Sequence, residues 1–152
     1  MESLEQLLSE HPFLQGLAPR HLSRLARCAE VKQFAADQFL FREGEEIKEF
    51  FLVRYGQVAM EIYTARRGPI MVQTRQEGDI LGWLGVTPPV QWNIDARAMV
   101  ITRTIALKTD CLLRVCEEDH ELGYELLKRF VSRMAHHFKS LKLQLLDIRH
   151  GV

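Results

Sequence analysis

The sequence has 152 residues, of which 47% are hydrophobic and 26% charged, a balance typical of a folded globular protein rather than a disordered chain. Its 20 basic and 20 acidic residues cancel, so no overall electrostatic attraction to nucleic acid or to an anionic membrane is expected. The length suits a single domain with one hydrophobic core and excludes two full-sized domains.

Residues 1–32 are predicted to be mainly helical. The opening stretch MESLEQLLSE is acidic and amphipathic, which favours a short helix over residues 3–8 and is unlike a secretory signal peptide. Pro12 and Gly16 indicate a turn after this helix. Pro19 then suits the first position of a second helix, where its missing N–H removes no hydrogen bond.

Residues 33–108 show the two-residue period of β-strands instead. The stretch FFLVRYGQVAMEIY is predicted to form two short strands hinged at Gly56. In the second of these strands, Val58, Met60 and Ile62 are expected to point to one side. Short strands separated by glycine-containing turns favour an antiparallel barrel or sandwich.

Residues 109–152 return to the helical period. The stretch TDCLLRVC is predicted to be a short helix. Asp119 is a suitable N-cap for a long final helix that continues to about Ile148 without a proline. Gly123, near the start of that helix, is expected to weaken it modestly.

The cysteines, Cys28, Cys111 and Cys116, are few and odd in number, which does not suit a disulfide framework. The spacing of the last two is also not a common zinc-ligand spacing. We therefore expect three buried or idle thiols, as in a protein of the reducing cytoplasm, and no metal site. No apolar run approaches the roughly 20 residues that cross a bilayer, so no membrane partner is expected.

Three stretches of the chain carry a family resemblance: PFLQGLAPRHLSRLA, FLFREGEEIKEFFLVRYGQVAMEI with turns at Gly44 and Gly56, and GDILGWLGV. Followed by one long helix, they resemble the cyclic-nucleotide-binding domain of the catabolite-activator (Crp/Fnr) superfamily over nearly the whole chain. The resemblance implies an α+β fold, in which an antiparallel β-barrel of the jelly-roll (double-stranded β-helix) type is flanked by N-terminal helices and a long C-terminal dimerisation helix. The predicted divisions of this single domain, residues 1–152, are helices at 1–32, a barrel at 33–108 with a phosphate-binding cassette at 78–93, and helices at 109–152.

The cassette of this chain departs from the family pattern at its two polar anchors. Family members place a glutamate directly after the cassette glycine, where it binds the ribose, and an arginine later in the loop, where it pairs with the cyclic phosphate. In this sequence Trp83 follows Gly82, and Trp92 stands at the arginine position. Arg97 lies five residues further on and would face the other side of a regular strand. The predicted pocket residues are Gly82, Trp83, Leu84, Gly85, Trp92 and Asn93.

The backbone of the cassette keeps features that suit an anion. A short helical turn after a glycine presents unpaired N–H groups, and Gly82 and Gly85 would let a ligand approach the backbone closely. Losing both side-chain anchors, by contrast, costs about 3–4 kcal/mol, or roughly 300-fold in affinity. We therefore expect weak or absent binding of cyclic AMP and cyclic GMP in the usual mode.

Three roles stay open for the two tryptophans. Their indole faces suit stacking on the base of a nucleotide, and cyclic nucleotides and NAD(P)(H) are the candidate ligands. They would otherwise fill the pocket and stabilise a dry core, or line a site for an unrelated small ligand. No cofactor is assigned by the sequence alone.

The final helix carries an apolar seam whose members are spaced alternately by four and three residues, the pattern of paired helices. We predict a homodimer formed through this helix, as the family resemblance also implies. The alternative is that the seam packs only on its own domain. The seam residues are Leu127, Val131, Met134, Phe138, Leu141, Leu145 and Ile148.

No catalytic motif is recognised, so the sequence predicts a protein that is not an enzyme. One hypothesis is a regulatory sensor, in which a ligand in the barrel shifts the cassette and the long helix, which then presents or hides a surface for a protein partner. The other is a ligand-free interaction subunit of a larger complex, because residues 92–98 loosely resemble small cyclic-nucleotide-domain proteins of bacterial redox complexes such as soluble hydrogenases. The sequence ends at Val152 before any helix-turn-helix, so no direct DNA binding is expected.

Overall fold

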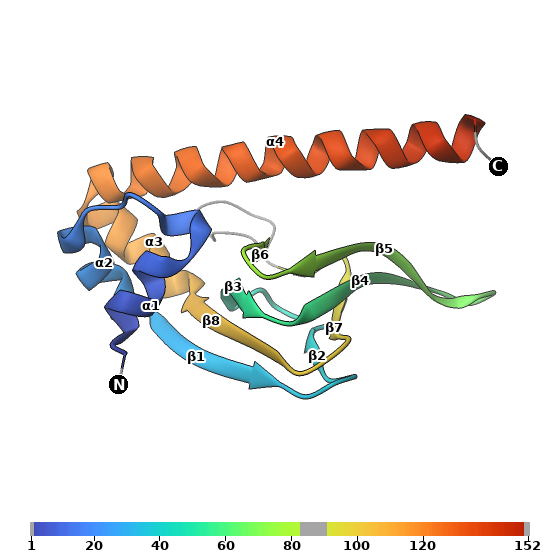
Figure 1. Cartoon of the computed structure of the whole chain (residues 1–152), viewed down its shortest axis with the longest axis horizontal. Helices are drawn as coiled ribbons and strands as arrows, with labels where there is room; N and C mark the ends of the chain where they lie inside the picture. Colours follow the sequence, from blue (N-terminus) through green and yellow to red (C-terminus); the bar gives the residue numbers. More distant parts are fainter. Residues whose placement is uncertain (1, 83–90, 151–152) are drawn as a thin grey trace.

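Eight β-strands form two antiparallel sheets in the described part of the chain, residues 2–82 and 91–150 of a computed structural model (Figure 1). The strands are β1 (Ala29–Phe34), β2 (Phe39–Phe41), β3 (Glu49–Tyr55), β4 (Gln57–Thr64), β5 (Gly68–Gln76), β6 (Ile80–Leu81), β7 (Asp95–Ala98) and β8 (Thr102–Lys108). One sheet has the order β1-β8-β3-β6, and the other has the order β2-β7-β4-β5. This arrangement confirms the predicted antiparallel barrel of the jelly-roll type.

The two sheets face each other across an apolar interior, which forms the first of two buried clusters. β3 contributes Phe51 and Val53 from one sheet, and β4 contributes Val58 and Met60 from the other. Trp92 belongs to the same cluster. The barrel is therefore filled by side chains from both of its sheets.

The opposite face of β3 forms the second buried cluster together with the helices. Because successive side chains alternate along a strand, Phe50 and Leu52 point away from the barrel interior. They pack with helical residues such as Leu8, Leu112 and Leu122. β3 is thus buried on both faces, which explains its unbroken apolar run.

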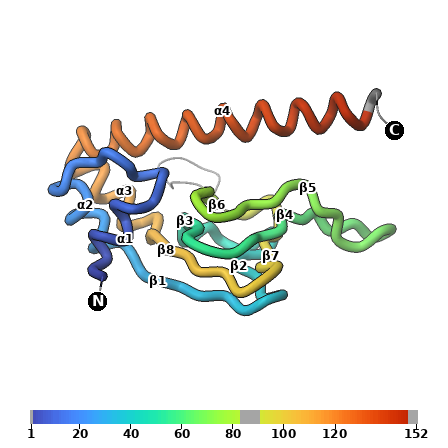
Figure 2. Tube along the Cα trace, viewed as in Figure 1, coloured from blue at the N-terminus to red at the C-terminus, as the bar shows by residue number. Residues whose placement is uncertain are grey.

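Helices cover one end and one side of the barrel (Figures 1 and 2). They are α1 (Leu4–Glu10), the 3-10 helix η1 (Pro12–Leu14), α2 (Pro19–Ala26), α3 (Thr109–Glu118) and α4 (His120–His150). Ser3 caps α1, because its hydroxyl accepts a hydrogen bond from the Gln6 backbone N–H at 3.2 Å. Pro19 opens α2 as predicted. The helices expected before and after the barrel are therefore confirmed.

α4 is the longest element, with 31 residues, and runs along one side of the barrel (Figure 2). Asp119 is its N-cap, as predicted, because its carboxylate accepts a hydrogen bond from the Leu122 backbone N–H at 3.2 Å. Gly123 lets the helix pass close to α3, since a β-carbon there would lie 3.2 Å from the β-carbon of Cys116. The glycine that we expected only to weaken the helix thus has a packing role.

β4 and β5 form a hairpin whose tip extends beyond the other strands, beside the C-terminal half of α4 (Figures 1 and 2). Pairing of β4 with β7 ends at Glu61, and the register of β4 against β5 shifts between Met60 and Glu61. Ile62, expected on one side with Val58 and Met60, is 44% exposed. The strand has passed beyond β7 at this position, so the apolar interior no longer covers its side chain.

A disulfide joins Cys28 and Cys111, whose Cα atoms are 5.5 Å apart. The expectation of three idle thiols is therefore wrong for this pair, and Cys116 is a free thiol. The reason is tertiary: the Lys108 N–H donates to the Cys28 carbonyl at 3.0 Å, which places the start of β1 beside the end of β8 and the first turn of α3. A sequence separation of 83 residues hides this proximity.

Candidate functional site

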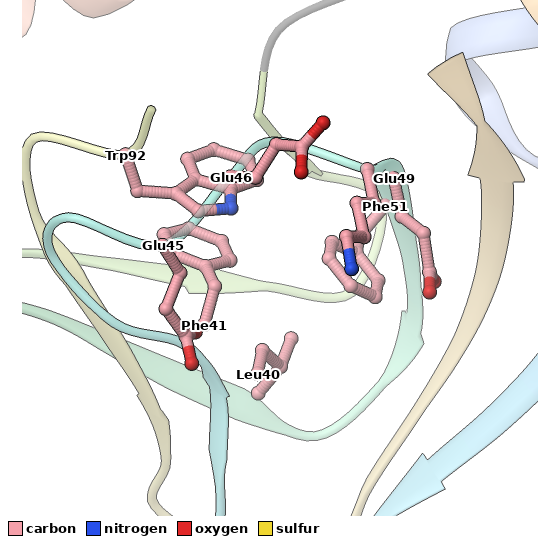
Figure 3. Close-up of a pocket in the computed structure, with 8 residues that line it drawn as sticks. Leu40, Phe41, Glu45, Glu46, Glu49, Phe51 and Trp92 are labelled. Carbon is pink, nitrogen blue, oxygen red and sulfur yellow. The ribbon is translucent and has the colours of Figure 1, made fainter. Parts of the chain in front are cut away.

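Trp92 lies in the barrel interior, with only 9% of its surface exposed. Its ring stacks on Phe41 of β2, with ring centroids 3.5 Å apart and planes inclined by 7° (Figure 3). Two backbone hydrogen bonds hold the residue: its N–H donates to the Glu45 carbonyl at 2.9 Å, and its carbonyl accepts from the Gly44 N–H at 2.8 Å. The indole at the expected arginine position is thus part of the core.

Gly82, directly after β6, lies against the far end of this indole. Its φ of +114° is in the region that favours glycine, and a β-carbon there would lie 2.6 Å from Cη2 of Trp92. We expected this glycine to let a ligand approach the backbone closely. The space beside Gly82 is instead occupied by the indole, so the two predicted pocket residues pack against each other.

A cavity of about 410 Å³, here called the helix-side cavity, lies between the barrel and α4. Its volume is within the range of about 300–1,000 Å³ that is usual for small-molecule sites. Its described lining consists of Ile47, Met60, Val72, Gln73, Arg75, Ile80, Leu81, Gly82, Gln91, Trp92, Asn93, Ile94, Met134, His137 and Leu141.

Three of the six predicted pocket residues, Gly82, Trp92 and Asn93, line this cavity. The other three, at positions 83–85, lie outside the described residues. Two of the predicted seam residues, Met134 and Leu141, line the same cavity from α4. The long helix therefore forms one wall of the candidate site.

Several hydrogen bonds connect α4 to the strands around the helix-side cavity, among them two from the Gln73 side-chain amide of β5 to Ser140 and Gln144, both at 3.4 Å. The Arg133 guanidinium donates to the Gly78 carbonyl at 2.9 Å, in the turn before β6. The Gln144 side-chain amide donates to the Val72 carbonyl at 3.0 Å, in β5. These contacts tie α4 to β5 and to the turn before β6.

Arg75 and Gln73 are polar residues of the cavity that sequence reasoning missed. Residues directly opposite each other in an antiparallel pair project to the same side of the sheet. Arg75 is paired with Val58 and Gln73 with Met60, so both project toward the side that carries the barrel interior. The simple alternation of the sequence does not say which side of β5 faces inward, and the pairing with Val58 and Met60 decides it.

The guanidinium of Arg75 lies near the carboxylate of Asp79, whose charge acts on it. It donates a hydrogen bond to the neighbouring Thr74 carbonyl at 3.2 Å and forms no ion pair with a carboxylate in the described part of the chain. Burial lowers the pKa of Arg75, an effect that the charge of Asp79 opposes. Burial, followed by the charge of Arg75, also lowers the pKa of His137 to about 4, so this imidazole is neutral at pH 7.

Arg97, the candidate substitute for the missing cassette arginine, is engaged elsewhere. It forms a two-pronged ion pair with Glu61, in which both N–O distances are 3.0 Å. A third hydrogen bond, to Asp37, measures 2.8 Å. Arg97 is not part of the described lining of the helix-side cavity, and its contacts connect β7 to β4 and to the turn before β2.

Trp92 also borders a second cavity of about 340 Å³, which we call the acidic cavity (Figure 3). Carboxylates outnumber cations in its lining, although Glu49 is also paired with Lys32. The acidic cavity is therefore less favourable for an anion than the helix-side cavity. Its lining is Leu40, Phe41, Glu45, Glu46, Lys48, Glu49, Phe51 and Trp92.

The described residues contain no group of three His, Cys, Asp or Glu side chains arranged to hold a metal ion. His136 and His137 are neighbours on α4, with ring centroids 6.3 Å apart. Within residues 2–82 and 91–150, no helix is both long and apolar enough to cross a membrane.

Comparison with known families gives one match: the family model described as "Cyclic nucleotide-binding domain" matches residues 31–119. Among curated proteins, the chain is 27% identical over 108 residues to the cAMP-dependent protein kinase regulatory subunit of Eremothecium gossypii, covering 71% of this chain and 22% of that protein. It is 28% identical over 82 residues to human cGMP-dependent protein kinase 2, covering 53% of this chain and 11% of that protein. The chain thus spans less than a quarter of the length of these relatives.

Solved structures share the fold. A cyclic nucleotide-binding domain from Methylobacillus flagellatus KT superposes with a TM-score of 0.81 at 16% identity, covering 99% of this chain and 84% of the other. The sensor domain of the transcriptional regulator DNR from Pseudomonas aeruginosa superposes with a TM-score of 0.70 at 19% identity, covering 89% of this chain and 91% of the other. At these identities the likeness concerns the fold alone.

Proposed function

Because the chain belongs to the cyclic nucleotide-binding domain family, we propose that it is a non-enzymatic regulatory sensor whose helix-side cavity takes a small ligand. Matched proteins include a kinase regulatory subunit and the sensor domain of a transcriptional regulator, which supports a regulatory role. A nucleotide, either a cyclic nucleotide or NAD(P)(H), is the ligand class to test first. A cytoplasmic location and a protein partner stay predictions.

One observation carries this proposal: the helix-side cavity is bounded by β6, which lies in the predicted cassette, on one side and by α4 on the other. Gly82 and Trp92 line it from the barrel, while Met134 and Leu141 line it from the helix. A ligand that contacts both walls stabilises one of their relative positions, and a partner of α4 would sense the change. The Arg133 contact with the turn before β6 supports this coupling.

The same site is expected to bind cyclic AMP and cyclic GMP weakly in the family's usual mode. The cassette arginine is absent, and the indole that replaces it is packed between Phe41 and Gly82. Isothermal titration calorimetry should therefore give a millimolar dissociation constant or no heat. Micromolar binding of either nucleotide would contradict this expectation.

A thermal-shift screen against cyclic mononucleotides, cyclic dinucleotides and NAD(P)(H) tests the sensor function. Val72→Phe narrows the cavity and should abolish the response to any ligand found. Val31→Phe, at an exposed position of β1, is the matched control and should preserve the response. The proposal fails if neither the melting temperature nor the indole emission of the wild type changes across the panel.

The proposed sensor is a homodimer that pairs through α4. Six of the seven seam residues are exposed in the single chain, which supports a second copy as their cover. The exposed members are Leu127, Val131, Phe138, Leu141, Leu145 and Ile148.

A second function, that of a ligand-free interaction subunit, is supported by the filled space beside Gly82. There the indole of Trp92 lies where a close ligand would approach the backbone. Such a subunit should co-purify from its own cells within a larger complex, with or without redox partners. Recovery of the free homodimer alone would exclude this alternative.

A further inference from the structure

We propose that Arg75 and His137 form an anion-binding end of the helix-side cavity, which takes a small molecule with a flat apolar body and one carboxylate, phosphate or sulfonate group. This inference rests on the proposed function, because it assumes that the cavity is a ligand site. It assigns the charge recognition to β5 and α4 rather than to the loop before β7.

The position of Arg75 in the sheet is the first support. The side chain opposite Arg75 on β4 is Val58, which is fully buried in the barrel interior. A guanidinium on this side of a strand is partly desolvated, because it lies on the side that carries the apolar cluster around Val58. A charged group held at such a position is typical of a binding site rather than of a core.

The lack of a close ion pair for Arg75 among the described residues is the second support, although the carboxylate of Asp79 lies near enough to act on it. Arg75 has no ion-pair partner in the described part of the chain, and residues 83–90 include no Asp or Glu. The nearby carboxylate of Asp79 accepts a hydrogen bond from the Gln76 backbone N–H at 2.8 Å. A guanidinium has five N–H donors in a planar fork; within the described residues Arg75 uses one of them, on the Thr74 carbonyl, and the others can hold an anionic group.

His137 adds a neutral hydrogen-bonding group on the facing wall. Its ring lines the cavity from α4, and burial lowers its pKa to about 4. At pH 7 the imidazole therefore supplies one N–H donor without a second positive charge. An anion bound between Arg75 and His137 would contact β5 and α4 together, which connects recognition to the helix.

The rest of the lining determines how the ligand lies. Trp92, Met134 and Leu141 provide an apolar surface for a flat body. Trp92 also lines the acidic cavity, whose carboxylates disfavour an anionic group at the Trp92 end of the ligand site. The anionic group is therefore expected at the Arg75 end, with the apolar body against the indole.

Two fluorescent probes with nearly the same aromatic body test this assignment. The anionic probe is 8-anilino-1-naphthalenesulfonate, and the neutral probe is N-phenyl-1-naphthylamine. We expect Arg75→Gln to raise the dissociation constant of the anionic probe by about tenfold to a hundredfold and to leave that of the neutral probe unchanged. Arg75→Lys should restore part of the preference for the anion. Arg66→Gln removes the same charge at an exposed position of the β4–β5 turn and should change the dissociation constant of neither probe.

Val72→Phe distinguishes a failure of the anion-binding end from a failure of the whole cavity as a ligand site. Suppose that Val72→Phe raises the dissociation constants of both probes, while Arg75→Gln raises both equally or changes neither. The cavity is then a ligand site, and the proposal of an anion-binding end is wrong. If neither probe binds the wild type, or Val72→Phe affects neither probe, the cavity is not a ligand site and both proposals fail. Circular dichroism of each variant verifies that a lost signal reflects binding rather than unfolding.

Discussion

At the scale of single residues, Trp92 determines what the barrel interior can hold. It stacks on Phe41 and abuts Gly82, so an apolar ring occupies the place where the family resemblance implies a guanidinium. The helix-side cavity has a positively charged residue in its described lining, Arg75, which comes from another strand. The proposed site therefore takes its positive charge from outside the predicted cassette.

The Gly82–Trp92 contact predicts a steric effect that can be measured. Gly82→Ala combines an unfavourable φ with a methyl group 2.6 Å from the indole, so we expect the free energy of unfolding to fall by about 3–4 kcal/mol. Gly44→Ala also has a positive φ, but nothing lies within 4 Å of its added β-carbon, and it should cost only about 1–2 kcal/mol. Urea unfolding distinguishes the two variants, and equal losses would contradict the steric explanation.

His11 predicts how stability depends on pH. Its Nε2–H donates to the Val53 carbonyl at 2.9 Å and its Nδ1 accepts from the Phe13 N–H at 3.1 Å, so the buried ring is neutral. Burial lowers its pKa from 6.5 to about 4. The unfolded chain therefore binds the proton first, and stability present above pH 6.5 is lost as the pH falls toward 4.

For the wild type we expect this residue to remove about 2 kcal/mol of stability between pH 7.5 and pH 5. His11→Gln keeps a hydrogen-bond donor for the Val53 carbonyl but does not titrate in this range. Urea unfolding of both proteins at both pH values gives the difference. An identical pH dependence in the variant would show that His11 is not the responsible group.

At the scale of elements, the helical end of the molecule is held by a covalent link. The Cys28–Cys111 disulfide connects the segment between α2 and β1 to the first half of α3. α3 is followed by the Asp119 cap of α4 and packs against that helix at Gly123. The disulfide thus restrains the elements from which the long helix starts.

Reduction of this disulfide should lower the free energy of unfolding by about 2–4 kcal/mol, because the intact disulfide closes a long loop in the unfolded chain. Thermal unfolding with and without dithiothreitol measures the effect, and alkylation should count one free thiol before reduction and three after it. Cys116→Ser should keep the response to reductant, whereas Cys111→Ser should abolish it. An unchanged melting temperature on reduction of the wild type would contradict the prediction.

At the scale of the whole molecule, α4 divides its apolar residues between two neighbours. Met134 and Leu141 face the helix-side cavity of the same chain. Val131 and Phe138, by contrast, are 64% and 69% exposed. A helix that exposes so much apolar surface is typically covered by a partner, and the heptad spacing favours a second copy.

Phe138→Asp should therefore convert the homodimer to a monomer, raising its dissociation constant by at least about tenfold, without lowering the stability of the single chain. Val31→Asp is the matched control, because Val31 is 47% exposed on β1, which lies on the opposite side of the barrel from α4 (Figure 1). Light scattering after gel filtration measures the mass of each variant. A monomeric wild type would contradict the proposed dimer.

Several features could be predicted because they depend on neighbours in the sequence. Pro19 at a helix start, Asp119 as an N-cap and the strand–turn–strand around Gly56 all lie where local pattern placed them. The candidate site was predictable only in part. Gly82 and Trp92 do lie together at the cavity, but their mutual contact was not foreseen.

The order of elements, the antiparallel barrel type and the presence of two tryptophans in the predicted cassette were determined by the sequence itself, since periodicity, capping and residue identity act within a few positions along the chain. The tertiary structure alone decided that Arg75 faces the cavity, that Cys28 meets Cys111 and that the indole fills the space beside Gly82. Each of these depends on strand register or on contacts between distant segments. Such pairings are set by packing of the whole chain, and no local pattern encodes them.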